Sequence, residues 1–162
     1  MPYIADRAPL SKFISTFLKP IIKQQNSPFS ISNTTTFIDE LLKYQPQPNK
    51  IMISFDVESL YPSLLHQLIL NSTEEFLREN QVDQIIVRKM TKLIALCLET
   101  NILAYDSKTY EQIKGSPRGS SLSTSVAEIV MRRIDNWITS LFPSDIVLWR
   151  RYIDDIFCIL KQ

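Results

Sequence analysis

Two adjacent carboxylates, Asp154 and Asp155, interrupt an apolar run near the end of the sequence. Leaving water is costly for a carboxylate unless a partner meets it, and neighbouring carboxylates also repel one another. A sequence that keeps such a pair is expected to present both acids at a tight turn between two strands, facing a cation. A third carboxylate, Asp56, lies in another apolar run, residues 51–57. Together the three acids predict a divalent-metal site on adjacent strands.

Three carboxylates of this kind suit phosphoryl transfer. Two divalent ions about 3.5–4 Å apart can activate an attacking oxygen and stabilise a leaving oxygen. Mg²⁺ is commonly held by one or two protein carboxylates together with substrate phosphates, and Asp56 and Asp154 are expected to share such ions. The alternative is an ordinary hairpin turn at Asp154-Asp155 and a strand-end cap at Asp56, because short motifs also match by chance.

Both glycines of the chain, Gly115 and Gly119, fall in one short loop before a predicted helix. Glycine lets a backbone approach a ligand closely or adopt a positive φ. The Ser120 and Ser121 hydroxyls, and the N–H groups at the start of that helix, can contact phosphate, sugar or base. A plain strand-to-helix loop is the alternative, but the presence of both glycines in it favours a loop that faces a ligand.

An aromatic side chain, Tyr61, follows Asp56 by five positions and precedes Pro62. A ring just past a metal-binding carboxylate could pack against a nucleotide sugar and clash with a 2′-hydroxyl. A core tyrosine at a strand–helix junction is the alternative.

Apolar residues at three- and four-residue steps predict the helices that position these groups. Pro20 is expected to kink the helix at residues 10–22 or end its regular part. The helical region that begins at residue 62 is expected to break near Asn71. The last is expected to place Trp137 and Leu141 on its apolar face. The predicted helical ranges are 10–22, 37–42, 62–69, 82–99 and 122–141.

Runs rich in β-branched and aromatic residues predict the strands. Residues 51–57 are expected to form a buried strand. Two strands, 101–104 and 110–113, are expected to join through a turn at 106–108. Strands 146–153 and 156–160 are expected to flank a turn formed by Asp154-Asp155.

Composition describes an ordinary globular protein of one domain. The 162 residues are 44% hydrophobic and 22% charged, and no apolar run approaches a membrane span. The net charge of +1 and the scattered basic residues count against tight independent binding of nucleic acid. Cys97 and Cys158 are expected to be buried thiols in a reducing compartment, and His66 a surface or packed histidine.

In order along the chain, these motifs resemble motifs A, B and C of a reverse transcriptase palm, most closely in the Penelope-like retroelement family. Residues 55–61 (FDVESLY) resemble its first acid motif, residues 110–123 its glycine-loop motif, and residues 151–157 (RYIDDIF) its double-aspartate motif. Residues 10–22 and 37–42 resemble the stretch before the first motif, so the likeness covers most of the chain.

The resemblance implies roles for the acid residues. Asp56 and Asp154 would be the principal ligands of two Mg²⁺ ions, for which Mn²⁺ could substitute, with Asp155 beside them near the primer end. The Val57 backbone carbonyl could complete the coordination. Tyr61 would be the steric gate that favours deoxynucleotides.

The resemblance also implies which residues meet the substrates. Arg118, Gly119 and Ser120 would line the templating base pair and the incoming nucleotide, and Tyr152 would steady the primer terminus. Arg118 stands where that family commonly has methionine and where retroviral relatives have glutamine. Two further positions where prolines are expected carry Ser121 and Thr124 instead, which could alter template contact without touching the metals.

The implied fold is α+β: a small antiparallel, palm-like sheet packed on helices, with part of the fingers. Residues 1–162 are expected to be one partial domain, with fingers-side helices at 1–50 and the palm at 51–162. The basic fingers segment would precede Met1, and the thumb and any endonuclease domain would follow Gln162.

The implied activity is RNA-directed DNA synthesis by a retroelement nucleotidyltransferase. Its partners would be an RNA template, a DNA primer and dNTPs, with no membrane, in the nucleus or cytoplasm. Three alternatives stay open. They are a truncated relic that folds and at most binds nucleic acid weakly, an RNA-templated RNA polymerase, which Tyr61 argues against, and a structural globule with an incidental acidic turn.

Overall fold

The computed structural model describes residues 8–44, 48–99, 102–106, 108–117 and 119–162. The chain divides into two compact units. Unit 1 comprises Met1–Gln25 and Ser59–Met131, and unit 2 comprises Asn26–Glu58 and Arg132–Gln162. The division into a fingers side and a palm remains a prediction.

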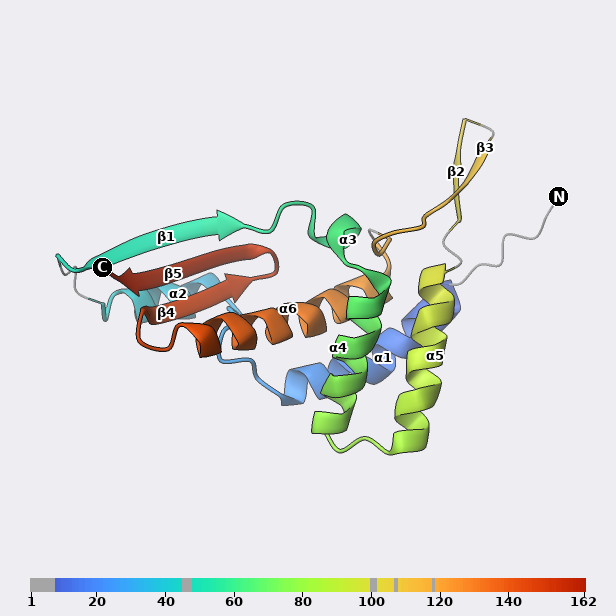
Figure 1. The fold of residues 1–162 in the computed structure, drawn as a ribbon, viewed down its shortest axis with the longest axis horizontal. Coiled ribbons are helices and arrows are strands. Elements are labelled where there is room, and N and C mark those ends of the chain that lie inside the picture. The colour runs from blue at the N-terminus through green and yellow to red at the C-terminus, as the bar shows by residue number, and fades with distance from the viewer. Residues whose placement is uncertain (1–7, 45–47, 100–101, 107, 118) are drawn as a thin grey trace. The chain divides into compact units, whose positions relative to one another are not determined.

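Unit 1 is helical. It contains α1 (Ala8–Gln24), α3 (Leu60–Ser63), α4 (His66–Glu79), α5 (Gln84–Glu99) and the first half of α6 (Ser121–Leu141). Helices α4 and α5 lie side by side and antiparallel (Figure 1). Their inward stripes are apolar and buried, with Ile69, Leu77, Val87 and Ile94 fully covered.

Two helix boundaries differ from expectation. Helix α1 continues through Pro20 to Gln24. The break predicted near Asn71 lies instead at Leu64, whose extended backbone separates α3 from α4. Asn71 lies inside α4, where its side chain accepts a hydrogen bond of 2.7 Å from Gln67 one turn earlier, and such i,i+4 pairs support a helix.

A two-stranded hairpin also belongs to unit 1. Strands β2 (Ile102–Tyr105) and β3 (Lys108–Glu111) pair antiparallel. The predicted hairpin is confirmed, although β3 begins two positions earlier than expected. Asn101 and Ser107, which the sequence placed in this hairpin, lie outside the described residues.

Unit 2 is built on a three-stranded antiparallel sheet of order β1-β5-β4, with β1 (Lys50–Asp56), β4 (Ile146–Tyr152) and β5 (Asp155–Lys161) (Figure 1). The last strand is therefore the central one. Its register on β1 runs from Lys50 opposite Lys161 to Asp56 opposite Asp155. This small antiparallel sheet with its helices confirms the α+β fold class.

One helix contacts each face of this sheet. Helix α2 (Thr34–Leu41) is capped by Asn33, whose side chain accepts a 2.8 Å bond from the Thr36 N–H. On this side, the Phe37 ring lies edge-on to Phe157 at 5.5 Å. The second half of α6 packs on the other face through Asp135, described below.

Two burial expectations were wrong. Strand β1 is an edge strand with no fully buried residue, because only β5 flanks it in the described part of the sheet. On α6, Trp137 and Leu141 are 61% and 52% exposed, whereas Asp135 is fully buried. The face of α6 that the sheet covers is therefore rotated from the one that apolar spacing indicates.

Both cysteines are buried thiols, as predicted. Burial raises the pKa of the Cys158 thiol above its ordinary 9.0. Within the described ranges, no helix combines the length and the apolar character needed to cross a bilayer.

The ion pair between Glu40 of α2 and Arg150 of β4 gives a testable pH dependence. Hydrogen bonding to Arg150 lowers the pKa of Glu40 below its ordinary 4.5. A lowered carboxyl pKa stabilises the fold above about pH 4.5, and this stabilisation is lost as pH falls toward the folded-state pKa. Because the pair is partly exposed, Glu40→Gln should cost no more than about 1 kcal/mol at pH 7. Urea unfolding at pH 7 and pH 3 measures the difference in the free energy of unfolding between the wild type and Glu40→Gln. A difference at pH 3 as large as that at pH 7 would contradict this assignment.

Candidate active site

The turn between β4 and β5 consists of Ile153 and Asp154. The sequence placed the turn at Asp154-Asp155, one position later, and this was wrong because Asp155 already joins the ladder opposite both Asp56 and Tyr152. Ile153 has φ 58°. A β-branched residue is rarely found at positive φ, so the turn is locally strained.

Three predicted site residues form one row across the sheet. Asp56 on β1 lies opposite Asp155 on β5, which lies opposite Tyr152 on β4. Directly opposed residues of an antiparallel pair project to the same face. The row therefore brings two of the predicted carboxylates and the predicted primer-contacting tyrosine together on one face.

The remaining predicted acid, Asp154, is tied to the end of β1 through its backbone. Its carbonyl accepts a bond of 3.1 Å from the Val57 N–H. A bond at this position identifies Asp56 and Asp155 as a non-hydrogen-bonded pair, in which the two Cα atoms approach to about 4.5 Å. The Asp154 side chain belongs to the turn itself, immediately before the row.

Charge makes this arrangement unfavourable by itself. Like charges directly opposite in a sheet are destabilising, and no basic residue shares the row. All three carboxylates keep some contact with solvent, Asp56 and Asp155 being exposed and Asp154 half-buried. An added cation would relieve the repulsion, and this is the arrangement expected of a site that binds one.

The donor set fits a hard divalent ion held loosely. Across the described residues, no three His, Cys, Asp or Glu side chains are grouped closely enough to hold a metal ion. Mg²⁺ does not require such a cage, since it usually keeps several waters and binds through one or two carboxylates plus substrate phosphates. Asp56 and Asp155, with Asp154 next in sequence, supply oxygen donors of that kind.

In unit 1, the glycine loop is fastened to the segment that carries Tyr61. The Ser116 N–H donates to the Tyr61 carbonyl at 2.9 Å. The His66 Nε2 lies 2.8 Å from the Gly115 carbonyl oxygen, so His66 is a packed histidine, as expected. These two contacts tie the loop to the tyrosine segment, although the two are about fifty positions apart in sequence.

Gly115 is required at this junction for a steric reason, which predicts a difference between the two glycines. A Cβ on Gly115 would lie 2.7 Å from the Cα and O of Pro62, whereas one on Gly119 would meet nothing within 4 Å. Both have positive φ, 81° and 85°. Each alanine substitution should therefore cost about 1–2 kcal/mol through its backbone, but Gly115→Ala should cost more.

Thermal unfolding of the two variants measures this difference, with Gly119→Ala as the matched control. Equal losses of stability would contradict the close approach to Pro62.

The other predicted substrate residues are placed as follows. Arg118 lies outside the described residues. Gly119 is exposed, and Ser120, half-buried, donates its N–H to the Pro117 carbonyl at 3.4 Å in a turn just before α6. Tyr61 and the glycine loop belong to unit 1. The row of Asp56, Asp155 and Tyr152, called the acid row below, belongs to unit 2. The roles given to these residues, and to the acids, remain predictions.

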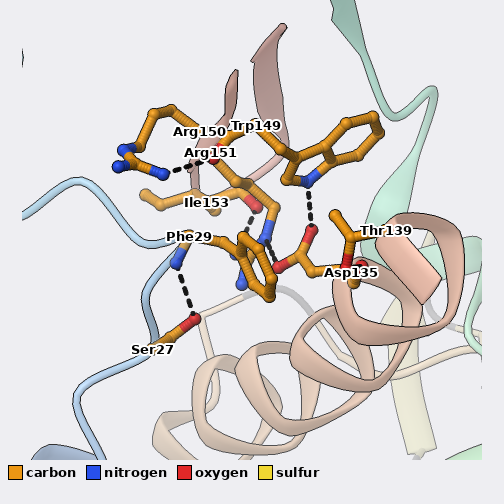
Figure 2. Close-up of polar contacts among 8 residues, drawn as sticks. All are labelled: Ser27, Phe29, Asp135, Thr139, Trp149, Arg150, Arg151 and Ile153. Carbon is orange, nitrogen blue, oxygen red and sulfur yellow. Dashed lines mark hydrogen bonds and ion pairs between the residues drawn. The ribbon is translucent and has the colours of Figure 1, made fainter. Parts of the chain in front are cut away.

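Sequence reasoning missed one polar group in unit 2. Asp135 of α6, Trp149 and Arg151 of β4 form a buried hydrogen-bonded cluster (Figure 2). A signal was present: Trp149 and Arg151 alternate along a predicted strand, so an inward tryptophan requires an inward arginine. A buried guanidinium needs an acid partner, and only the three-dimensional packing identifies that acid as Asp135.

The fold is similar to that of solved telomerases. Apo telomerase from Candida tropicalis, truncated from its C-terminal domain, matches with a TM-score of 0.72 and 16% identity, over 93% of this chain and 34% of that one. Telomerase from Candida albicans in complex with a TWJ fragment of telomeric RNA matches with a TM-score of 0.69 and 12% identity, over 96% and 30%. The chain thus spans about a third of these proteins, and the likeness concerns the fold.

The fold, with helices packed around a small antiparallel sheet, is accordingly of the reverse transcriptase type. Residues 4–162 match the family described as "Reverse transcriptase (RNA-dependent DNA polymerase)". This chain belongs to the reverse transcriptase family. Polymerases of this family generally use divalent metal ions. A comparison with curated proteins gave no match.

Proposed function

We propose that this chain is the palm of an RNA-directed DNA polymerase that adds dNTPs to a primer 3′ end by a two-metal mechanism. The observation that carries the proposal is the row in which Asp56 and Asp155 oppose each other, with Asp154 in the adjoining turn. Two opposed carboxylates cost stability in the absence of a cation, so their retention on an exposed face supports a functional site.

In this proposal Asp56 and Asp154 are the principal Mg²⁺ ligands, assisted by the Val57 carbonyl, and Asp155 lies beside them. Bound divalent ions would supply the charge that activates the primer 3′-hydroxyl and offsets the charge on the leaving pyrophosphate. The carboxylates hold and orient that charge on the sheet. Mn²⁺ satisfies the same oxygen donors and could replace Mg²⁺.

The remaining residues select and align the substrates. Tyr61 serves as the gate against the 2′-hydroxyl of a ribonucleotide, and Tyr152, exposed at the end of the row, supports the primer terminus. Arg118, Gly119 and Ser120 line the position of the templating pair. The bond from Ser116 to the Tyr61 carbonyl supports a shared role, because it links the gate to the glycine loop.

We further propose a retroelement origin of the Penelope-like type, with action in the nucleus or cytoplasm. The support is the amino-acid sequence of the three motifs. They are FDVESLY, the loop that contains Gly115 and Gly119, and RYIDDIF. Flanking sequence that encodes a thumb and an endonuclease would support this origin. Flanking sequence typical of a telomerase would overturn it and leave the polymerase proposal intact.

Primer extension by the full-length protein tests the activity. The assay supplies an RNA template, a DNA primer and either dNTPs or NTPs, with Mg²⁺ or with EDTA. The expected result is extension that depends on Mg²⁺ and on dNTPs. Extension with NTPs alone would indicate an RNA polymerase, and no extension by a folded protein would indicate a relic.

A further inference from the structure

Arg151 connects the buried side of the sheet to the turn formed by Ile153 and Asp154. Its Nε donates to Asp135 Oδ2 at 2.8 Å, and its NH1 donates to the Ile153 carbonyl at 2.9 Å (Figure 2). Trp149 Nε1 donates to the other oxygen of Asp135 at 2.9 Å. One guanidinium therefore spans from α6 to the turn that carries Asp154.

The anchor of this connection is buried and held by several hydrogen bonds. Both side chains of the Asp135–Arg151 pair are completely buried. The Arg151 backbone is also held, since its N–H donates to the Phe29 carbonyl and its carbonyl accepts from Ile31, each at 2.8 Å. A buried ion pair is weak grounds for expecting stability, because desolvation offsets its attraction. Its presence directly behind the turn suggests a geometric role.

The turn is the place where such a restraint is needed. Ile153 has the left-handed φ of 58°, which is unfavourable for a β-branched residue and persists only where its surroundings fix it. The Arg151 side chain donates to the carbonyl of that same residue. A relaxed turn would shift Asp154, which lies in the turn, and Asp155, which begins β5 opposite Asp56.

We propose that Arg151, anchored by Asp135, is a positioning residue that fixes the Ile153-Asp154 turn and so aligns the carboxylates of the acid row. The inference rests on the proposed function where it treats this row as the metal site. A positive charge at position 151 is not sufficient to fix the turn. The guanidinium is required because its separate N–H groups reach the carboxylate and the carbonyl together.

Arg151→Lys tests the positioning role, because lysine keeps the positive charge beside Asp135 but lacks the separate N–H groups of the planar guanidinium. The readout is hydrogen exchange of the Val57 amide, which bonds to the Asp154 carbonyl and so reports the closure of the turn onto β1. The expected exchange is about tenfold faster, which corresponds to the loss of about one hydrogen bond. Amides in the middle of β5, such as Cys158, should keep their protection.

Arg150→Lys is the matched control. Arg150 is the adjacent residue of β4 and also pairs with a helix carboxylate, Glu40, but its side chain bonds to Glu40 and to the Trp149 carbonyl and not to the turn. Val57 exchange should remain within about twofold of the wild type in this variant. An unchanged Val57 rate in Arg151→Lys, or an equal acceleration in both variants, overturns the proposal.

Asp135→Asn provides a second approach, since it preserves the side-chain size and keeps one carbonyl oxygen as an acceptor while removing the negative charge that anchors the guanidinium. It should produce the same local acceleration at Val57. If both Arg151→Lys and Asp135→Asn lose protection throughout the sheet, the pair is a general stability element and the positioning role is rejected.

Binding of Mn²⁺, followed by its electron paramagnetic resonance signal, separates this inference from the proposed function. About tenfold weaker binding in Arg151→Lys than in the wild type is expected, because one hydrogen bond fewer holds the turn. Wild-type protein that binds no Mn²⁺ would count against the proposed function, while the exchange rates would still decide the role of Arg151.

Discussion

Asp154→Asn is expected to reduce primer extension by about 10³-fold or more, with little change in the fold. The reason is that a neutral amide binds a divalent ion far more weakly than a carboxylate, and several kcal/mol of transition-state stabilisation depend on that ion. The fold should persist because Asp154 contributes its backbone carbonyl, and not its side chain, to the bond with Val57. Primer extension under saturating Mg²⁺, together with thermal unfolding, measures both effects.

Asp145→Asn is the matched control for this experiment. Asp145 is exposed in the turn before β4, at the end of the sheet away from Ile153 and Asp154, and its backbone carbonyl likewise accepts a hydrogen bond, from Lys161. The same chemical change there should leave extension within about twofold of the wild type. A wild-type rate in Asp154→Asn would refute the role of this residue as a metal ligand.

Asp135→Ala is expected to destabilise the fold by about 3–5 kcal/mol, the largest stability effect that we predict. It leaves the Arg151 guanidinium buried with no carboxylate at 2.8 Å and removes the acceptor of the Trp149 N–H. Chemical denaturation at pH 7 measures the loss. Asp39→Ala, at an exposed position of α2, is the control and should change the stability by less than about 0.5 kcal/mol.

A double variant identifies the cause of that loss. Replacing both partners of a buried pair by apolar residues of similar volume is often neutral. Asp135→Leu combined with Arg151→Met should therefore recover much of the stability that Asp135→Ala loses. No recovery would mean that the individual contacts, and not the uncompensated charge, carry the effect. The double variant should still lose the restraint on the turn at Ile153.

Much of the fold follows from local patterns in the sequence. Apolar periodicity located α1 and α5, because this signal arises within a few residues, whereas the helix expected at 62–69 with a break near Asn71 is α4, which runs from His66 to Glu79. Burial on β1 and on α6 did not follow in this way. An apolar run such as Ile51–Val57 is compatible with a central or an edge strand, and only the strand order β1-β5-β4 decides between them.

The candidate site shows the same division. The types of the acids and their places at strand ends indicated a shared site, and the register brings Asp56 opposite Asp155. The one-residue shift of the turn could not be read from the sequence, because an isoleucine at positive φ contradicts the usual turn preferences. In our proposal Arg151 and Asp135 hold the turn in this position, and these two residues meet only after the helix packs on the sheet.

The central place of β5 has a consequence for the order in which the protein matures. Asp56 and Asp155 are roughly a hundred residues apart, and contacts over such separations form slowly because a long loop must close first. During synthesis, β1 leaves the ribosome long before the strand that pairs with it. The row of Asp56, Asp155 and Tyr152 therefore forms only after the whole segment between β1 and β5 has been synthesised, so a nascent chain that stops before β5 carries Asp56 without its partner.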